Sequence, residues 1–86
     1  MYAEVTKFGW TLTVDLHGLT VEEAKAQLNE IIRDCDNTIK EIEVIHGYSR
    51  GNKLQGYVRS QLKHKRVIGK ELGLNQGITI LKIAKR

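Results

Sequence analysis

The sequence predicts an α/β domain, a two-layer α+β sandwich whose elements follow the order β-α-β-α-β-β. Segments with alternating apolar and polar residues, typical of strands, are separated by two segments with the spacing of amphipathic helices. The length of 86 residues is sufficient for one hydrophobic core and falls below the size at which a second domain usually appears. We therefore expect an N-terminal extension over residues 1–10 and a single domain over residues 11–86.

The first predicted strand covers residues 10–17 and has one apolar face. Its period of two places every second side chain in the core, and these side chains are Trp10, Leu12, Val14 and Leu16. Asp15 and His17 then share the opposite face of the strand. Gly18 interrupts the pattern, so the strand should end there.

A helix is predicted after Gly18. Thr20 and Glu23 have the spacing of a capping box, in which each side chain satisfies a backbone N–H group at the start of a helix. Apolar residues then recur at helical spacing as far as Cys35, so the helix should end near Asp36. Cys35 is the only cysteine, which excludes an internal disulfide, and its place in the apolar stripe predicts a packing role.

A second strand and a second helix follow. The segment from Ile39 to Ile45 is rich in Ile and Val and stops at Gly47, as a strand would. After a loop, Asn52 and Gln55 form a weaker capping pair for the second helix. The apolar positions of this helix are Leu54, Val58 and Leu62, and its exposed side carries Lys53, Arg59, Lys63 and Lys65.

Two more strands are predicted at the end of the chain, Val67 to Leu72 and Ile78 to Ala84, joined by a segment rich in turn formers. The first two strands of the domain should be parallel, because a helix connects them. Their carboxyl ends then meet at one edge of the sheet, where His17 and His46 both lie. Ligands tend to bind at this edge in α/β layers.

The charge is divided unevenly along the chain. Residues 1–43 contain four Lys or Arg and nine Asp or Glu, whereas residues 44–86 contain ten and one. A solubilising surface is one explanation for these charges. The second half of this small domain is strongly positive, which favours a polyanionic partner such as nucleic acid. A positive field would also speed the capture of that partner.

Two classes of protein are disfavoured by the sequence. No apolar run approaches the length of a membrane span. The first ten residues lack the apolar stretch and the cleavage site of an export signal. We therefore expect a cytoplasmic protein without a membrane partner, and we expect it to be a monomer.

The loop from Gly47 to Gly51 is expected to bind phosphate. It leads into the second helix, where unpaired N–H groups and the helix dipole attract an anion, and Arg50 and Lys53 lie beside it. Tyr48 could stack on an unpaired base, or its ring could simply cover the loop. The residues expected to contact nucleic acid are Gly18, Gly47, Tyr48, Arg50, Gly51, Lys53, Arg59, Lys63, Lys65 and Arg66.

Three residues are candidates for catalysis. His17 and His46 could act as general base and general acid in phosphodiester cleavage, because imidazole titrates near neutral pH, and Asp15 could orient one of them. Alternatively, these three residues could hold a divalent metal ion, but no further acidic residue is placed to complete such a site, and we predict no cofactor. A third interpretation is structural: each histidine caps its strand end and hydrogen-bonds a backbone carbonyl.

At Asp15-Leu16-His17-Gly18 and at His46-Gly47 the chain resembles the Smr domain, the small MutS-related module. The resemblance runs from about Thr11 to Ala84, and the chain looks like a stand-alone, short bacterial-type member. It implies a β-α-β-α-β-β fold similar to the C-terminal domain of bacterial translation initiation factor three. It also implies nucleic-acid binding and, in some members, endonuclease activity on DNA or RNA.

The second motif departs from the family pattern, because Ser49 stands where the middle glycine belongs and Leu54 falls one place late. A longer, less glycine-rich loop would approach a nucleic acid less closely, which favours binding over cleavage. Three hypotheses follow: a nucleic-acid-binding domain, an endonuclease, and an adaptor for a ribosome or a protein partner. The adaptor would use the acidic residues of the first helix, Glu22, Glu23, Glu30 and Asp34.

Overall fold

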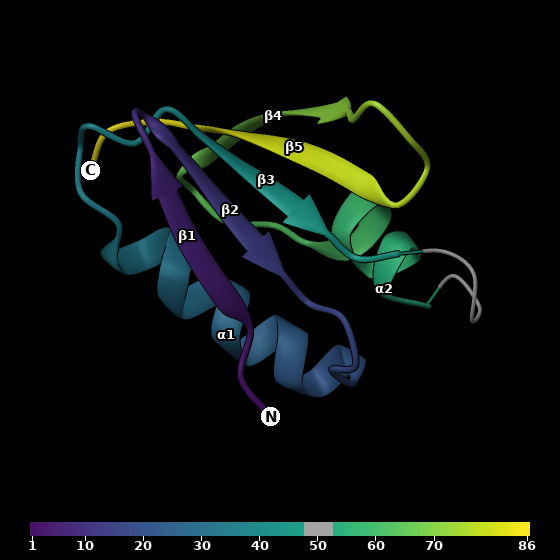
Figure 1. Cartoon of the computed structure of the whole chain (residues 1–86). Helices are drawn as coiled ribbons and strands as arrows, with labels where there is room; N and C mark the ends of the chain where they lie inside the picture. The colour runs from purple at the N-terminus through teal and green to yellow at the C-terminus, as the bar shows by residue number, and fades with distance from the viewer. Residues whose placement is uncertain (48–52) are drawn as a thin grey trace.

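The computed structural model describes residues 1–47 and 53–86 and shows an α+β sandwich of two layers (Figure 1). Within these residues, one layer is a five-stranded sheet in the order β1-β2-β3-β5-β4. The strands are β1 (Glu4–Phe8), β2 (Thr11–Asp15), β3 (Glu41–Ile45), β4 (Val67–Leu72) and β5 (Ile78–Ile83). β2 and β3 are parallel, as predicted, and the other neighbours are antiparallel. The predicted fold class is confirmed.

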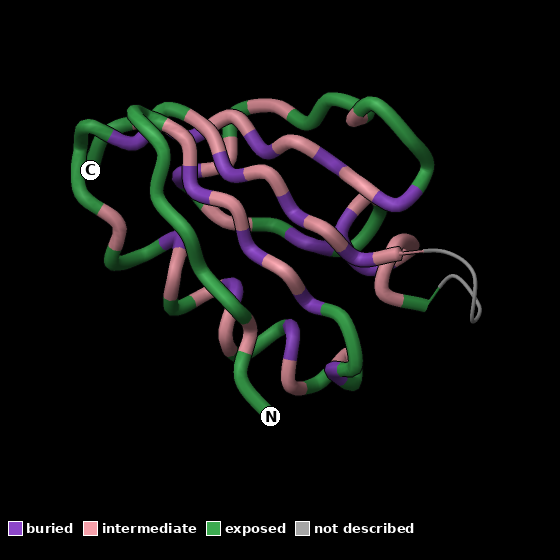
Figure 2. Tube along the Cα trace, viewed as in Figure 1, coloured by how far each residue is buried: buried purple, intermediate pink, exposed green. Residues whose placement is uncertain are grey.

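The other layer consists of α1 (Val21–Asp34), α2 (Lys53–Gly56) and the π-helical segment η1 (Tyr57–Gln61). Every second residue of β2, β3 and β5 is buried, which is the pattern of a sheet with one covered face (Figure 2). The core between the layers joins strand residues such as Val44 and Leu81 to Leu28 of α1 and Val58 of η1. No helix within the described residues is long and apolar enough to cross a membrane.

The predicted capping box is present at the start of α1. The Thr20 hydroxyl accepts a hydrogen bond from the Glu23 N–H group at 3.1 Å, and the Glu23 carboxylate accepts one from the Thr20 N–H group at 2.9 Å. Because both donors would otherwise lack partners at the helix start, the box fixes where α1 begins.

Residues 1–10 do more than extend the domain, because they include β1, which pairs antiparallel with β2. Gly9 and Trp10 form the two-residue turn between these strands, and Gly9 has the positive φ, 61°, of the first position in a type II′ turn. The prediction of a buried Trp10 is wrong: its side chain is 60% exposed. Trp10 belongs to the turn, so the alternation of β2 begins only at Thr11.

The second helix is shorter than predicted. After one turn of α2, the chain widens into η1, in which the Leu62 N–H group donates to the Tyr57 carbonyl at 2.8 Å, and the helix ends there. Lys63 and Lys65 therefore follow the helix instead of lying on it. Asn52 of the predicted capping pair lies outside the described residues, and the Gln55 amide donates to the Gln76 carbonyl at 2.7 Å.

Candidate functional site

The two predicted motifs meet at one edge of the sheet. Asp15 and Ile45 are paired at the carboxyl ends of β2 and β3, and the Leu16 N–H group continues the pairing by donating to the Ile45 carbonyl at 2.9 Å. The segments that follow β2 and β3 therefore leave the sheet at the same edge (Figure 1). Gly18 and Gly47 have φ values of 83° and 72°, in the left-handed region that favours glycine. Both motif glycines are thus required by the backbone turn that follows each histidine.

His17 is exposed at this edge, and Asp15 controls its backbone. The Asp15 carboxylate accepts a hydrogen bond from the His17 N–H group at 2.8 Å. This contact closes a short turn in which the aspartate side chain substitutes for a backbone carbonyl. Asp15 therefore positions His17 through its main chain; one hypothesis from the sequence was that it could orient an imidazole ring.

His46 is buried, with 6% of its surface exposed, and both ring nitrogens have partners. Nδ1 lies 2.9 Å from the Gly47 carbonyl oxygen, and Nε2 lies 2.8 Å from the Thr79 hydroxyl. A carbonyl only accepts hydrogen bonds, so the neutral ring carries its proton on Nδ1, and Nε2 accepts from Thr79. The Thr79 oxygen in turn accepts from Arg59 Nε at 2.8 Å. Burial lowers the pKa of His46, and the nearby Arg59 charge lowers it further.

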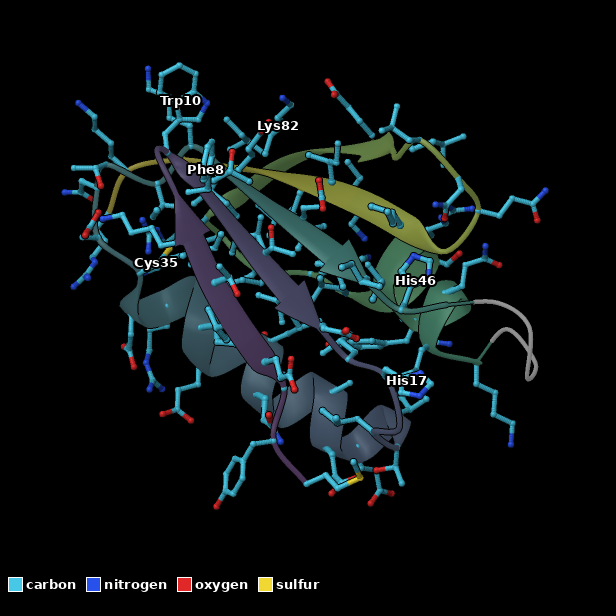
Figure 3. The ribbon with its side chains drawn as sticks, viewed as in Figure 1. Phe8, Trp10, His17, Cys35, His46 and Lys82 are labelled. Carbon is cyan, nitrogen blue, oxygen red and sulfur yellow. The ribbon has the colours of Figure 1, made fainter. Side chains whose placement is uncertain are left out.

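This network directs His46 away from His17. Thr79 belongs to β5, which lies on the side of β3 opposite to β2, so the ring of His46 is turned toward the interior beside β5 (Figure 3). Neither ring nitrogen is free to exchange a proton with a ligand near His17. Of the interpretations left open by the sequence, the contacts of His46 match the structural one, a strand-end histidine bonded to a backbone carbonyl.

Two of the arginines predicted to contact phosphate are occupied within the protein. Besides Thr79, Arg59 donates to the carbonyls of Gln76 and Ile78 at 3.3 and 3.2 Å, which ties η1 to β5. Arg66 is only 3% exposed, a burial that does not fit the predicted contact with nucleic acid.

Arg66 instead caps the end of α1. Its Nη1 donates to the carbonyls of Ile32 and Cys35 at 2.6 and 2.8 Å, and its Nε donates to the Ala84 carbonyl at 3.0 Å. The positive charge lies at the negative end of the helix dipole, where a cation is favourable. Arg66 therefore joins α1 to the end of β5.

Three of the predicted contacts, Lys53, Lys63 and Lys65, are exposed. None of these lysines takes part in the ion pairs found within the described part of the chain. Lys53 lines a hollow of about 360 Å³ between the start of α1 and the second helix, together with Val21 and Tyr57. Lys63 and Lys65 lie past the other end of that helix. The basic residues thus form an extended band instead of one cluster.

Thr79 and Lys70 make contacts at the site but were not among the residues predicted from the sequence. Thr79 lies on the buried face of β5 with Leu81. A buried hydroxyl group needs a hydrogen-bond partner, so a threonine at this position indicates a polar group in the core. Lys70 donates from Nζ to the Leu62 carbonyl at 2.7 Å, at the end of η1. No sequence pattern distinguishes this lysine from any other on an edge strand.

The remaining predicted contacts, Tyr48, Arg50 and Gly51, lie outside the described residues. Over residues 1–47 and 53–86, no group of three or more His, Cys, Asp or Glu side chains is arranged to hold a metal ion.

Comparison with models of protein families identifies the family of this chain. The family model described as Smr domain matches residues 14–76, which include both histidine motifs and the second helix. The chain belongs to the Smr domain family. No curated protein and no solved structure gives a significant match. In this Smr domain, the matched region ends before β5, so Thr79, the partner of His46, lies outside it.

Proposed function

We propose that this Smr domain binds nucleic acid through its phosphate backbone, at the edge formed by Gly18 and Gly47 and along the second helix. The observation that carries the proposal is the band of exposed lysines without carboxylate partners, Lys53, Lys63 and Lys65. Residues 44–86 contain a single acidic residue, so little in this half of the chain neutralises the band. Such an excess of positive charge attracts a polyanion and releases its counterions on binding.

The glycine turns support the same function. A residue without a Cβ atom lets a phosphate approach the main chain closely, and the space beside Gly47 is open among the described residues. In this proposal His46 is a positioning residue. It holds the first residue of the loop to β5 through Gly47 and Thr79, so that the loop starts from a fixed point.

The experiment is a salt titration of binding to labelled single-stranded and duplex DNA and RNA, read by fluorescence anisotropy. The logarithm of the affinity should fall linearly with the logarithm of salt concentration, by about 0.7 to 0.9 per phosphate contacted. Lys53→Glu should weaken binding about tenfold or more. Lys40→Glu is the matched control, because Lys40 is exposed at the opposite end of β3. Salt-independent binding, or equal losses in the two variants, would contradict the proposal.

Cleavage is a second candidate, and one observation favours it: His17 is exposed at the glycine edge with its backbone fixed by Asp15. Running the same mixtures on denaturing gels tests this directly. If the domain cuts, His17→Ala should abolish the products while preserving binding. Intact substrate at every protein concentration, with binding retained, would leave a binding domain without nuclease activity.

A further inference from the structure

A second hollow lies between the end of η1 and the edge strand β4. Its volume is about 320 Å³, and it is lined on one side by Ser60, Lys63 and His64 and on the other by Val67, Ile68 and Lys70. No carboxylate lines it, although acidic residues are common elsewhere on the surface. The hollow therefore combines two cations and a hydroxyl with an apolar wall.

His64, which lines the hollow, is held in place by two hydrogen bonds. Its Nδ1 accepts a hydrogen bond from the Arg66 N–H group at 3.1 Å, and its carbonyl accepts one from the Val67 N–H group at 2.9 Å. Because Nδ1 is the acceptor, the neutral ring carries its proton on Nε2. Nε2 has no hydrogen-bond partner among the described residues, so it remains available as a donor.

Lys70 is fixed as well, because its Nζ donates to the Leu62 carbonyl at 2.7 Å. Burial lowers the pKa of Lys70, and the nearby positive charge of Lys63 lowers it further. Two ammonium groups close enough to oppose each other's charge are stabilised by an anion between them. The hydroxyl of Ser60 and the Nε2–H group of His64 add neutral donors, as phosphate oxygens require.

We propose that this hollow holds one backbone phosphate of the bound nucleic-acid strand, with the sugar against Val67 and Ile68. This inference rests on the proposed function and adds a second contact point to it. Ser60 lines both hollows, so they adjoin across the second helix. Lys53 lies at the start of the second helix and Lys63 just past its end, so one strand that follows the helix can contact both hollows.

The test compares Lys63→Gln with Lys65→Gln. Both lysines are exposed, lie in the segment after η1 and carry the same charge, but only Lys63 lines the hollow. With single strands of eight nucleotides, Lys63→Gln should weaken binding about fivefold and reduce the salt slope by about 0.7. Lys65→Gln, which removes a lysine of the same band outside the hollow, should weaken binding by a clearly smaller factor.

A second measurement follows the Cε1–Hε1 signals of the three histidines by NMR, with His64→Gln used for assignment. The eight-nucleotide strand should shift the His64 signal, and inorganic phosphate or AMP should do so only at far higher concentration. Equal losses in the two lysine variants, or a His64 signal unmoved by the strand, would overturn the inference while salt-dependent binding persists. Equal affinity for AMP and the strand would assign the hollow to a free phosphate ester and also overturn it. Failure of the proposed function would differ, because no nucleic acid would bind.

Discussion

Acidification should destabilise this protein through His46. The ring is buried and neutral in the folded state, with its Nε2 lone pair accepting from Thr79 and its Nδ1 proton donated to Gly47. Protonation would require a second N–H group where the Thr79 hydroxyl now donates, next to Arg59. Burial and Arg59 accordingly lower the pKa of His46 below its ordinary value of 6.5.

The sign and the size of the effect follow from proton linkage. Below pH about 6.5 the unfolded chain binds a proton at His46 that the folded protein does not, so the free energy of unfolding falls as pH falls. The slope is at most about 1.4 kcal/mol per pH unit between the lowered folded-state pKa and 6.5. Between about pH 7.5 and 5.5 the loss from this residue is therefore at most about 1.4 kcal/mol. This window lies above the ordinary pKa values of the carboxyl groups, 3.8 and 4.5.

The assay is urea unfolding at the two pH values, comparing wild type with His46→Gln and with His17→Gln. His46→Gln should lower the free energy of unfolding at pH 7.5 and remove most of the pH-dependent difference. His17→Gln, which changes an exposed histidine at the same edge, should retain it. If His46→Gln shows the same pH-dependent loss as wild type, the buried and neutral state of His46 is refuted.

Two further predictions concern the ends of α1. Arg66→Ala should lower the free energy of unfolding by about 3 to 5 kcal/mol, because the carbonyls of Ile32 and Ala84 lose their guanidinium donor and the end of α1 loses its cap. Chemical denaturation measures this, and a loss below about 1 kcal/mol would show that the cap is unimportant. Thr20→Ala should cost about 1 kcal/mol, visible as a lower melting temperature, and Thr20→Ser should restore most of it. Equal melting temperatures for Thr20→Ala and wild type would contradict the role of the capping box.

Local signals in the sequence were sufficient to predict most of the fold. The capping box at Thr20, the period of β2 and the helical crossover each determine one feature of the structure, the last being the parallel pairing of β2 and β3. β1 was missed because Trp10 extends the apolar alternation of β2 by one step. The alternative signal was the Gly9-Trp10 pair, a two-residue turn with glycine first, flanked by β-branched and aromatic residues.

The candidate site was predicted less well, because its side chains depend on contacts distant in sequence. Nothing near His46 indicates that Thr79, 33 residues later, fills its hydrogen-bonding capacity. Nothing near Arg66 shows that the end of α1 lies beside it. The location of His17 and His46 at one edge of the sheet was predictable from the topology. The carboxyl ends of adjacent parallel strands lie at the same edge, and this does not depend on side-chain contacts.

Arginines and lysines have different tasks in this domain. Each arginine of the described part donates to an oxygen of the protein itself: Arg33, Arg59, Arg66 and Arg86. The planar guanidinium presents several donors at once, so it can join two elements, as Arg59 and Arg66 do. The ammonium groups of Lys53, Lys63 and Lys65 lie on exposed residues instead. The net charge of residues 44–86 therefore overstates the surface that can bind a polyanion. Substituting Arg59 or Arg66 should mainly change the free energy of unfolding, and substituting Lys53 or Lys63 should mainly change binding.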